Sequence, residues 1–330
     1  MKIKLVLLVL TALFFAQNVF AGKRAPTQPN SYDGIPPTAR AMAMGGAAAA
    51  QMITKDAAYY NPAALAFMSG AHANFSAIIM RKSGATPSQV AQIDPAGEGL
   101  TSAFLIKDSG AFMWQALSDN TIRTQNSDGS WQQVETYINA ITFSAGQKNE
   151  HGFSIGLNMT YLYGKIGESS VNASSEPYSN IASGNGFALD LSFLIPMGYG
   201  TYFGLNLKNL AGFMFWNDYN TEQLPFTVRA GMGYVYKGLA FDIDWDRKFY
   251  RFGSLQESAY YVGIEQALSN FFVFRAGVSY DENFDSENMK YSYGLSFHIK
   301  GYELSFASEQ YKISNEDFSK YMLTFNASVF

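Results

Sequence analysis

The sequence predicts an all-β protein, a 14-stranded antiparallel transmembrane β-barrel that a small N-terminal hatch plugs. Three observations support this fold class: an aromatic-rich composition, a long series of alternating segments, and connections that are short and long in turn. Aromatic residues make up 16% of the 330 residues, whereas charged residues make up only 15%. That combination is typical of a barrel whose outer face contacts lipid.

From residue 71 onward, apolar and polar residues alternate in fourteen runs, as expected for strands with two different faces. Most runs have about ten residues or more, the length that a tilted strand needs to cross a bilayer. The predicted strands are residues 71–81, 99–107, 110–118, 132–147, 151–166, 185–196, 200–210, 225–237, 238–247, 258–268, 270–281, 288–299, 301–312 and 319–330.

The connections between these runs are alternately short and long. Short links such as Asp108-Ser109-Gly110 and Lys237-Gly238 separate longer links that are rich in Ser, Asn, Asp and Gly. The longer links are 82–98, 119–131, 167–184, 211–224, 248–257, 282–287 and 313–318. An up-and-down barrel with short periplasmic turns and longer external loops has this arrangement. Its even strand number predicts that both chain termini lie in the periplasm.

Charged residues stay off the middle of the apolar face in the alternating runs. In residues 238–247, Asp242 and Asp244 lie opposite the apolar residues, and Arg229 and Arg275 do so in their own runs. These four residues are therefore expected to face the lumen. Lipid would enforce such segregation, because one Arg or Lys at the bilayer midplane costs about 2–4 kcal/mol. A secreted β-sandwich also alternates, but it accounts for neither the loop order nor the strand lengths.

The first 21 residues have the pattern of a secretory signal peptide. Lys2 and Lys4 precede an apolar run, and residues 19–21 fit a cleavage site before Gly22. We therefore expect export to the cell outer membrane, with residues 1–21 as signal peptide, 22–69 as hatch and 70–330 as barrel. The chain has no cysteine, so it forms no disulfide, and a net charge of −4 without a basic tract argues against a nucleic-acid partner.

Residues 22–69 do not alternate and are rich in Pro and Ala. Asn61 is placed to cap a short helix that has Pro62 at its first position. Asp56 is placed to cap another single turn, and Gly45-Gly46 lets the backbone turn or pack closely. The lumen of a fourteen-stranded barrel is too wide for its own side chains to fill. A compact segment of this length is therefore a suitable plug.

Three strings in this segment, taken in order, resemble the N-terminal hatch of the FadL family of outer-membrane transporters. They are ARAMAMGGA from Ala39, DAA from Asp56 and NPAAL from Asn61. The residues of this hatch motif are Arg40, Met44, Gly45, Gly46, Asp56, Asn61, Pro62 and Ala63. A later string, VGIEQALSNFFVFRAGVSY from Val262, is similar to the same family and also to the PorV group, related barrels that serve a secretion system.

The resemblance implies an outer-membrane channel for the passive transport of hydrophobic small molecules such as long-chain fatty acids. Hatch movement would be the gate, with Gly45-Gly46 as hinge and Asn61-Pro62 as latch. The alternative is a PorV-like interaction protein that serves protein secretion, and a structural or adhesive barrel is a third possibility. The expected partners are outer-membrane lipid, a hydrophobic ligand and the barrel assembly machinery, with exported proteins under the PorV-like alternative.

The first three predicted strands have apolar residues on both faces. We expect Ile78, Met80, Leu105, Met113 and Leu117 to face inward. They either pack against the apolar hatch, the explanation we favour, or line a path for a hydrophobic ligand. In FadL relatives the ligand is thought to leave sideways through a gap in the barrel wall beside an early strand, and we hypothesise the same exit here.

The sequence contains no evident catalytic constellation. The histidines are His72, His151 and His298. Ser296 and His298 share one face of a strand, which is the ordinary arrangement of a polar lumen wall. Asp242, Asp244 and Asp246 alternate along another strand, but alternate residues lie about 7 Å apart and do not readily complete a metal coordination shell. We therefore expect no enzyme activity, no metal and no cofactor.

Overall fold

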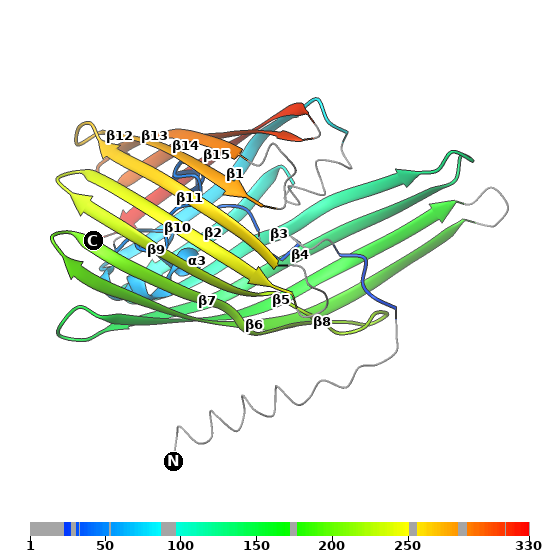
Figure 1. Ribbon diagram of the computed structural model, residues 1–330, viewed down its shortest axis with the longest axis horizontal. Coiled ribbons are helices and arrows are strands. Elements are labelled where there is room, and N and C mark those ends of the chain that lie inside the picture. Colours follow the sequence, from blue (N-terminus) through cyan, green and yellow to red (C-terminus); the bar gives the residue numbers. More distant parts are fainter. Residues whose placement is uncertain are drawn as a thin grey trace, which may run out of the picture.

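The structure, a computed structural model, describes residues 23–27, 31–32, 34–52, 54–86, 97–171, 177–250, 256–282, 289–313 and 315–329. The predicted signal peptide and Phe330 lie outside the described residues. The strands of the described chain form one antiparallel sheet (Figure 1). Their bounds are β1 Ala71–Ser83, β2 Gly99–Lys107, β3 Gly110–Gln125, β4 Trp131–Lys148, β5 Ser154–Val171, β6 Tyr178–Gly198, β7 Thr201–Trp216, β8 Glu222–Gln223, β9 Phe226–Tyr236, β10 Leu239–Phe249, β11 Gln256–Ala267, β12 Phe272–Asp281, β13 Met289–Ile299, β14 Tyr302–Ile313 and β15 Glu316–Val329.

The sheet closes on itself into a barrel. β1 to β7 pair in chain order, β7 pairs with β9, β9 to β15 pair in chain order, and β15 pairs with β1. The two-residue β8 is an additional strand that pairs with the far end of β7. Closure lets a sheet span a bilayer, because its two edges satisfy each other's backbone groups. The predicted fold class, a fourteen-stranded antiparallel barrel, is therefore confirmed.

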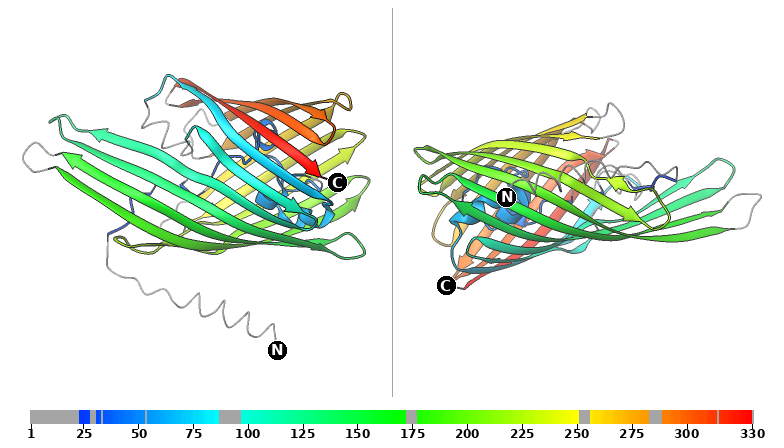
Figure 2. Two further views of the ribbon diagram at one scale, coloured as in Figure 1. Left: turned by 180° about the vertical axis from the view of Figure 1, so that it is seen from behind. Right: turned by 90° about the horizontal axis from the view of Figure 1, so that it is seen from below.

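All fourteen predicted strands are present, but several are longer than the sequence pattern indicated. β3 to β6 continue well beyond the other strands at the long-loop end of the barrel (Figures 1 and 2). The predicted long link at 119–131 is mostly strand, with a turn in which the Asn126 amide donates to the Ser130 carbonyl at 2.8 Å. The outer face of these extensions is largely polar, with residues such as Thr121 and Gln133, so the apolar pattern of that face ends before the backbone pairing does.

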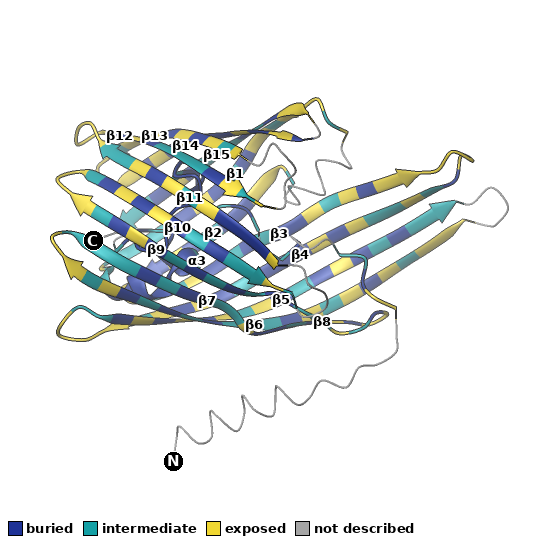
Figure 3. Cartoon of the chain, in the orientation of Figure 1, coloured by how far each residue is buried: buried dark blue, intermediate teal, exposed yellow. Residues whose placement is uncertain are grey.

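The two faces of the strands have the predicted character (Figure 3). On β10, Ile243 is 48% exposed on the outer face, whereas Asp242 and Asp244 are buried on the inner face. Arg229 of β9 and Arg275 of β12 are buried as well. The outer face is thus apolar where it would contact lipid, and the charges lie inside.

Two of the residues predicted to face inward lie on the outer face instead. Met80 is 41% exposed because a β-bulge at Ile79 reverses the alternation in the rest of β1. Leu105 is 56% exposed, and its neighbours Phe104 and Ile106 are the buried, inward residues of β2. Because Phe104, Leu105 and Ile106 are all apolar, the sequence does not indicate which of them face inward. Pairing of β2 with β1 and β3 determines it.

The N-terminal residues include three short helical turns, α2 Ala39–Ala43, α3 Ala57–Tyr60 and the 3₁₀ turn η1 Pro62–Phe67. Within the described ranges, no helix has the length and apolar character to cross a membrane. At the long-loop end, the Lys23 ammonium contacts Glu168 of β5 at 2.6 Å, whereas Val329 pairs with Ala71 at the short-turn end. Residues 71 and 329, where the barrel begins and ends, therefore lie at the same end of it, and residue 23 lies at the opposite end.

Candidate functional site

A belt of glycine residues on the inner wall receives the backbone of residues 34–52 and 54–69, which we call the N-terminal segment. A Cβ atom added to any glycine of the belt would lie within 3.1 Å of a segment atom, whereas ordinary contact begins at 3.4 Å. Only residues without a side chain let two backbones approach so closely. The belt consists of Gly146 on β4, Gly156 on β5, Gly204 on β7, Gly231 and Gly233 on β9, Gly263 on β11, Gly277 on β12 and Gly294 on β13. The alternation of apolar and polar residues does not reveal this belt, but glycines at inward positions of seven strands are the signal in the sequence that indicates it.

The predicted turn at Gly45-Gly46 is present. Both residues have positive φ, 65° and 87°, and they follow Met44 directly after α2. A Cβ on Gly45 would also lie 2.8 Å from the Val278 amide nitrogen on β12. Glycine is therefore required here both for the backbone conformation and for the close approach to the wall.

The Asn61-Pro62-Ala63 motif attaches the segment to β6. The Asn61 side chain caps η1 by accepting a hydrogen bond from the Ala63 amide at 3.1 Å, with Pro62 at the first position, as predicted. The Asn61 amide group also donates to the Phe193 carbonyl at 3.0 Å, and Ser192 Oγ accepts from the Ala63 amide at 3.0 Å. One motif thus forms a turn and fastens it to the wall.

Arg40 and Asp56 of the hatch motif form an ion pair within the segment. Arg40 Nη1 lies 3.2 Å from Asp56 Oδ2, and Thr38 Oγ1 donates to Asp56 Oδ1 at 2.5 Å. Thr38 also accepts from the Ala41 amide and so caps α2. Asp56 occupies the N-cap position of α3, as predicted. The prediction that its side chain caps the helix is wrong, because that side chain binds Arg40 and Thr38 instead. Burial opposes a charge on Arg40, yet Glu265 and Asp56 outweigh burial and raise the pKa of Arg40.

A row of alternating charges connects this ion pair to the wall. Glu265 of β11 bonds to Arg40 at 2.9 Å and to Arg275 of β12 at 2.6 Å. Arg275 lies 3.5 Å from Glu303 of β14, which in turn contacts Lys55 of the segment at 2.8 Å. The predicted lumen residue Arg275 therefore lies between two carboxylates that each hold a cation of the segment.

A second charged contact holds the backbone after Gly46. Arg229 and Asp244, both predicted to face the lumen, form an ion pair 2.6 Å apart, and Asp244 accepts from the amides of Ala48 and Ala49 at 2.9 and 3.0 Å. Arg229 also donates to the Gly46 carbonyl. Asp242, on the same face of β10, is fully buried next to this contact. Two wall residues thus satisfy three backbone groups of the segment.

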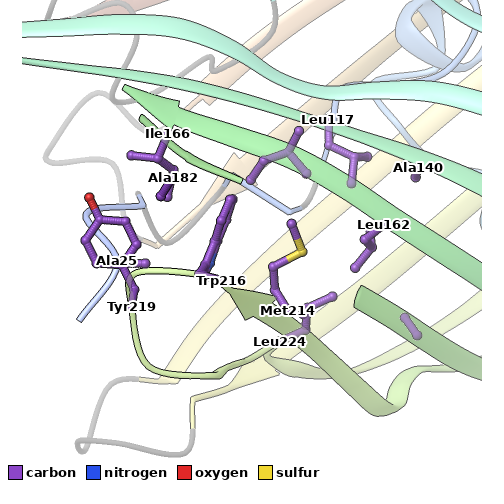
Figure 4. Close-up of a cluster of buried hydrophobic side chains, with 12 residues drawn as sticks. Ala25, Leu117, Ala140, Leu162, Ile166, Ala182, Met214, Trp216, Tyr219 and Leu224 are labelled. Atoms are coloured by element: carbon purple, nitrogen blue, oxygen red, sulfur yellow. The ribbon is translucent and has the colours of Figure 1, made fainter. Parts of the chain in front are cut away.

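The inward apolar residues of the first strands divide into two groups. Ile78 packs against Ile35, Ala39, Met42 and Ala43 of the segment, and Met113 packs against Ala58. Leu117 lies apart, in a buried cluster at the long-loop end that we call the mouth cluster (Figure 4). Its members are Ala25, Leu117, Ile138, Ala140, Leu162, Ile166, Ala182, Ala188, Met214, Trp216, Tyr219 and Leu224.

The mouth cluster is covered by residues 23–27 and 31–32, which we call the mouth strap. Ala25 is part of the cluster, and Tyr32 packs against it. Glu222 of β8 accepts hydrogen bonds from Thr27 Oγ1 and Tyr32 Oη, both at 2.5 Å, and from Trp216 Nε1 at 3.2 Å. These bonds place the strap across the apolar side chains.

Ser296 and His298, which share one face of β13, contact other residues of the wall and not each other. Ser296 Oγ bonds with Arg275 and with Ser305, the latter at 2.6 Å, and His298 Nε2 lies 3.8 Å from Glu303. His72 contacts the Ser328 hydroxyl and the Ser69 carbonyl. These histidine contacts hold strands and the segment together.

Neither protein-family models nor curated protein sequences match this chain. Solved structures do resemble it. The CymD monoaromatic hydrocarbon channel is 15% identical with a TM-score of 0.62, covering 90% of this chain and 98% of that one. A Pseudomonas aeruginosa FadL homologue is 12% identical with a TM-score of 0.59, covering 93% and 100%. The P. putida toluene transporter TodX is 10% identical with a TM-score of 0.58, covering 90% and 99%. The chain thus has the fold of the FadL-like outer-membrane barrels.

Proposed function

We propose that this chain is an outer-membrane channel for the passive transport of hydrophobic small molecules. The observation that carries the proposal is the mouth cluster, a buried apolar cluster at the long-loop end of a barrel whose inner wall contacts the N-terminal segment. The neighbours named as a monoaromatic hydrocarbon channel and a toluene transporter support a hydrophobic cargo. Long-chain fatty acids, implied by the resemblance to FadL, are the other candidate cargo.

In this proposal the long loops face outward, the short turns face the periplasm, and the N-terminal segment is a hatch that gates the lumen. Gly45-Gly46 serves as the hinge, and Asn61-Pro62, bonded to β6, serves as the latch. The cargo leaves sideways through the wall beside β1, where the bulge at Ile79 interrupts the pairing register. Passage makes and breaks no covalent bond, so the proposal needs neither a catalytic residue nor a cofactor.

Uptake by cells that lack other hydrophobe channels tests the proposal. Cells that produce the protein should accumulate radiolabelled toluene or oleate faster than cells that do not. Leu117→Asp, which puts a charge into the mouth cluster, should abolish the difference, because an unpaired charge opposes an apolar ligand. Thr124→Asp, at an exposed site of the same strand, is the control, and heat resistance on a gel verifies folding. Equal uptake with and without the wild-type protein would refute the proposal.

The second candidate is a PorV-like interaction protein that holds exported proteins. The extension of β3 to β6 beyond the other strands favours this reading, since it offers a sheet with a largely polar outer face beyond the rest of the barrel (Figure 1). Large secreted proteins should then co-purify with the barrel, and shortening the hairpins at 119–137 and 165–183 should release them. Uptake of toluene and oleate should not change under this alternative.

A further inference from the structure

Asp242 is a carboxyl group that the protein encloses without giving it a hydrogen-bond donor. It faces inward from β10, and its side chain has no exposed surface. Among the residues that the structure describes, no group donates to either of its carboxylate oxygens. The next inward residues of the strand differ, because Asp244 accepts from Arg229 and Asp246 accepts from the Tyr261 hydroxyl. An ionised carboxylate that is buried without a donor is strongly unfavourable.

The backbone groups that approach Asp242 from the N-terminal segment are acceptors. Asp242 pairs with a glycine on each adjacent strand, Gly233 of β9 and Gly263 of β11. A Cβ atom on Gly233 would lie 2.9 Å from the Ala50 carbonyl oxygen, and one on Gly263 would lie 2.5 Å from the Met44 carbonyl oxygen. The segment thus covers Asp242 and places carbonyl oxygens on both sides of it. Only a protonated carboxyl group has an O–H that can donate to such neighbours.

The charges around Asp242 do not supply a free cation. Four carboxylates share the two guanidinium groups that act on Asp242, those of Arg229 and Arg40. They are Asp244 and Asp246, 2.6 and 3.8 Å from Arg229, and Asp56 and Glu265, 3.2 and 2.9 Å from Arg40. The rings of Tyr60 and Tyr261, which are neutral groups below about pH 10, also contact Arg229. An ionised Asp242 would add a negative charge where carboxylates already outnumber cations.

We propose that Asp242 takes up a proton from solvent when the N-terminal segment docks, and that this proton locks the segment to the wall. The O–H of Asp242 then donates to one of the surrounding oxygens, on Met44, Ala50 or Asp244. When the segment is undocked, water reaches the carboxyl group, which ionises above about pH 4 as an ordinary Asp does. The lock does not depend on which molecule the channel carries.

The lock makes docking depend on pH in one direction. The docked state holds a proton that the undocked state releases above about pH 4. The contribution of Asp242 to docking is therefore fully present below about pH 4 and decreases by about tenfold for each pH unit above it, for as long as the docked form keeps its proton. Acid should tighten the segment, and neutral solution should loosen it.

Infrared spectroscopy of the full-length barrel tests the proton directly. Dodecyl maltoside is the suitable detergent, because it has no ester carbonyl to overlap with the C=O stretch of a carboxylic acid. At pH 7, Asp242→Asn should remove the intensity of one carboxylic acid from this band. Asp246→Asn, on the same strand and face, is the matched control and should leave the band unchanged. A band that survives Asp242→Asn would show an ionised Asp242 and overturn the proposal, as would a band that only Asp246→Asn removes.

Hydrogen exchange of residues 44–50, corrected for the intrinsic chemical rate, tests the lock. In wild type the equilibrium constant for opening should rise about 100-fold from pH 5 to pH 7. Asp242→Asn is neutral throughout and keeps a donor, so its opening should not change with pH. The three histidines also titrate near this range, but Asp242→Asn retains them, so the difference between the two proteins belongs to Asp242.

A second variant and the wild type keep the test decisive. Asp242→Ser, a smaller neutral donor, should show the same pH-independent opening as Asp242→Asn, and heat resistance on a gel verifies that each variant is folded. Opening of the wild type that does not change with pH would show that docking takes up no proton. Equal pH dependence in wild type and both variants would assign the effect to another group. Either result overturns the lock.

Discussion

Replacing Gly156 by Ala should detach the Asn61 turn from the wall without unfolding the barrel. The added Cβ would lie 2.0 Å from the Ala63 amide nitrogen and 2.2 Å from the Pro62 carbonyl carbon. Ordinary contact begins at 3.4 Å, so the turn must move by the difference between 3.4 and 2.0 Å, about 1.4 Å. Such a shift breaks the bond from Ala63 to Ser192, now 3.0 Å long. Overpacking costs about 1–3 kcal/mol and a lost neutral hydrogen bond about 1 kcal/mol, so docking should weaken by about 2–4 kcal/mol.

Gly167→Ala on the same strand is the matched control. Its Cβ would meet Glu135 atoms at 3.6 Å, an ordinary contact, and the residue lies far from the segment. Hydrogen exchange of residues 57–67, measured by mass spectrometry on folded barrels, should accelerate by about 30-fold or more in Gly156→Ala and remain at the wild-type rate in Gly167→Ala. Equal exchange in the two variants would show that the belt does not hold the segment, and the reasoning from close approach would fail.

Asp244→Asn removes the closer of the two carboxylates that pair with the buried Arg229 and leaves Asp246 at 3.8 Å, which should cost about 1–3 kcal/mol, so residues 46–49 should exchange faster in the same experiment. Asn61→Ala removes the cap of η1, which costs about 1 kcal/mol, and should increase proteolysis of the segment in intact barrels; unchanged cleavage would contradict the assigned cap. Burial raises the pKa of Tyr60 well above 10.0. Its neutral form is therefore favoured in the docked state, so the contribution of Tyr60 to docking is constant below about pH 10 and weakens as the pH rises above it. Tyr60→Phe should abolish this loss between pH 10 and 12, as measured by protease sensitivity of the segment.

The barrel was predictable because its strands face two different environments. Lipid outside and a polar lumen inside impose a period of two, and this period located every strand of the ring. The pattern failed where that contrast is absent. The extensions of β3 to β6 are largely polar on the outer face, where lipid no longer imposes apolar residues, and Phe104-Leu105-Ile106 is apolar on both faces. The bulge at Ile79 reversed the phase at Met80 without any local signal, because only pairing with β15 defines it.

The candidate site was predictable only where the relevant residues are close in sequence. Asn61 and Ala63 lie in one turn, and Arg229 and Asp244 lie on adjacent strands, so their association could be expected. The contact of Lys55 with Glu303 joins residues 248 positions apart, and no local pattern links them. Glu222 was missed for the same reason, since its donors Thr27 and Tyr32 come from the start of the chain.

The strength of attachment differs along the N-terminal region, and this difference has a consequence for opening. Residues 39–63 are held by glycine contacts, buried ion pairs and bonds to wall carbonyls, so moving them breaks several interactions at once. The described residues of the mouth strap are held by side-chain hydrogen bonds to Glu168 and Glu222 and lie over the mouth cluster. Opening should therefore begin at the strap. Displacing the mouth strap breaks its hydrogen bonds to Glu168 and Glu222, whereas moving residues 39–52 and 54–63 also separates buried ion pairs, which costs more.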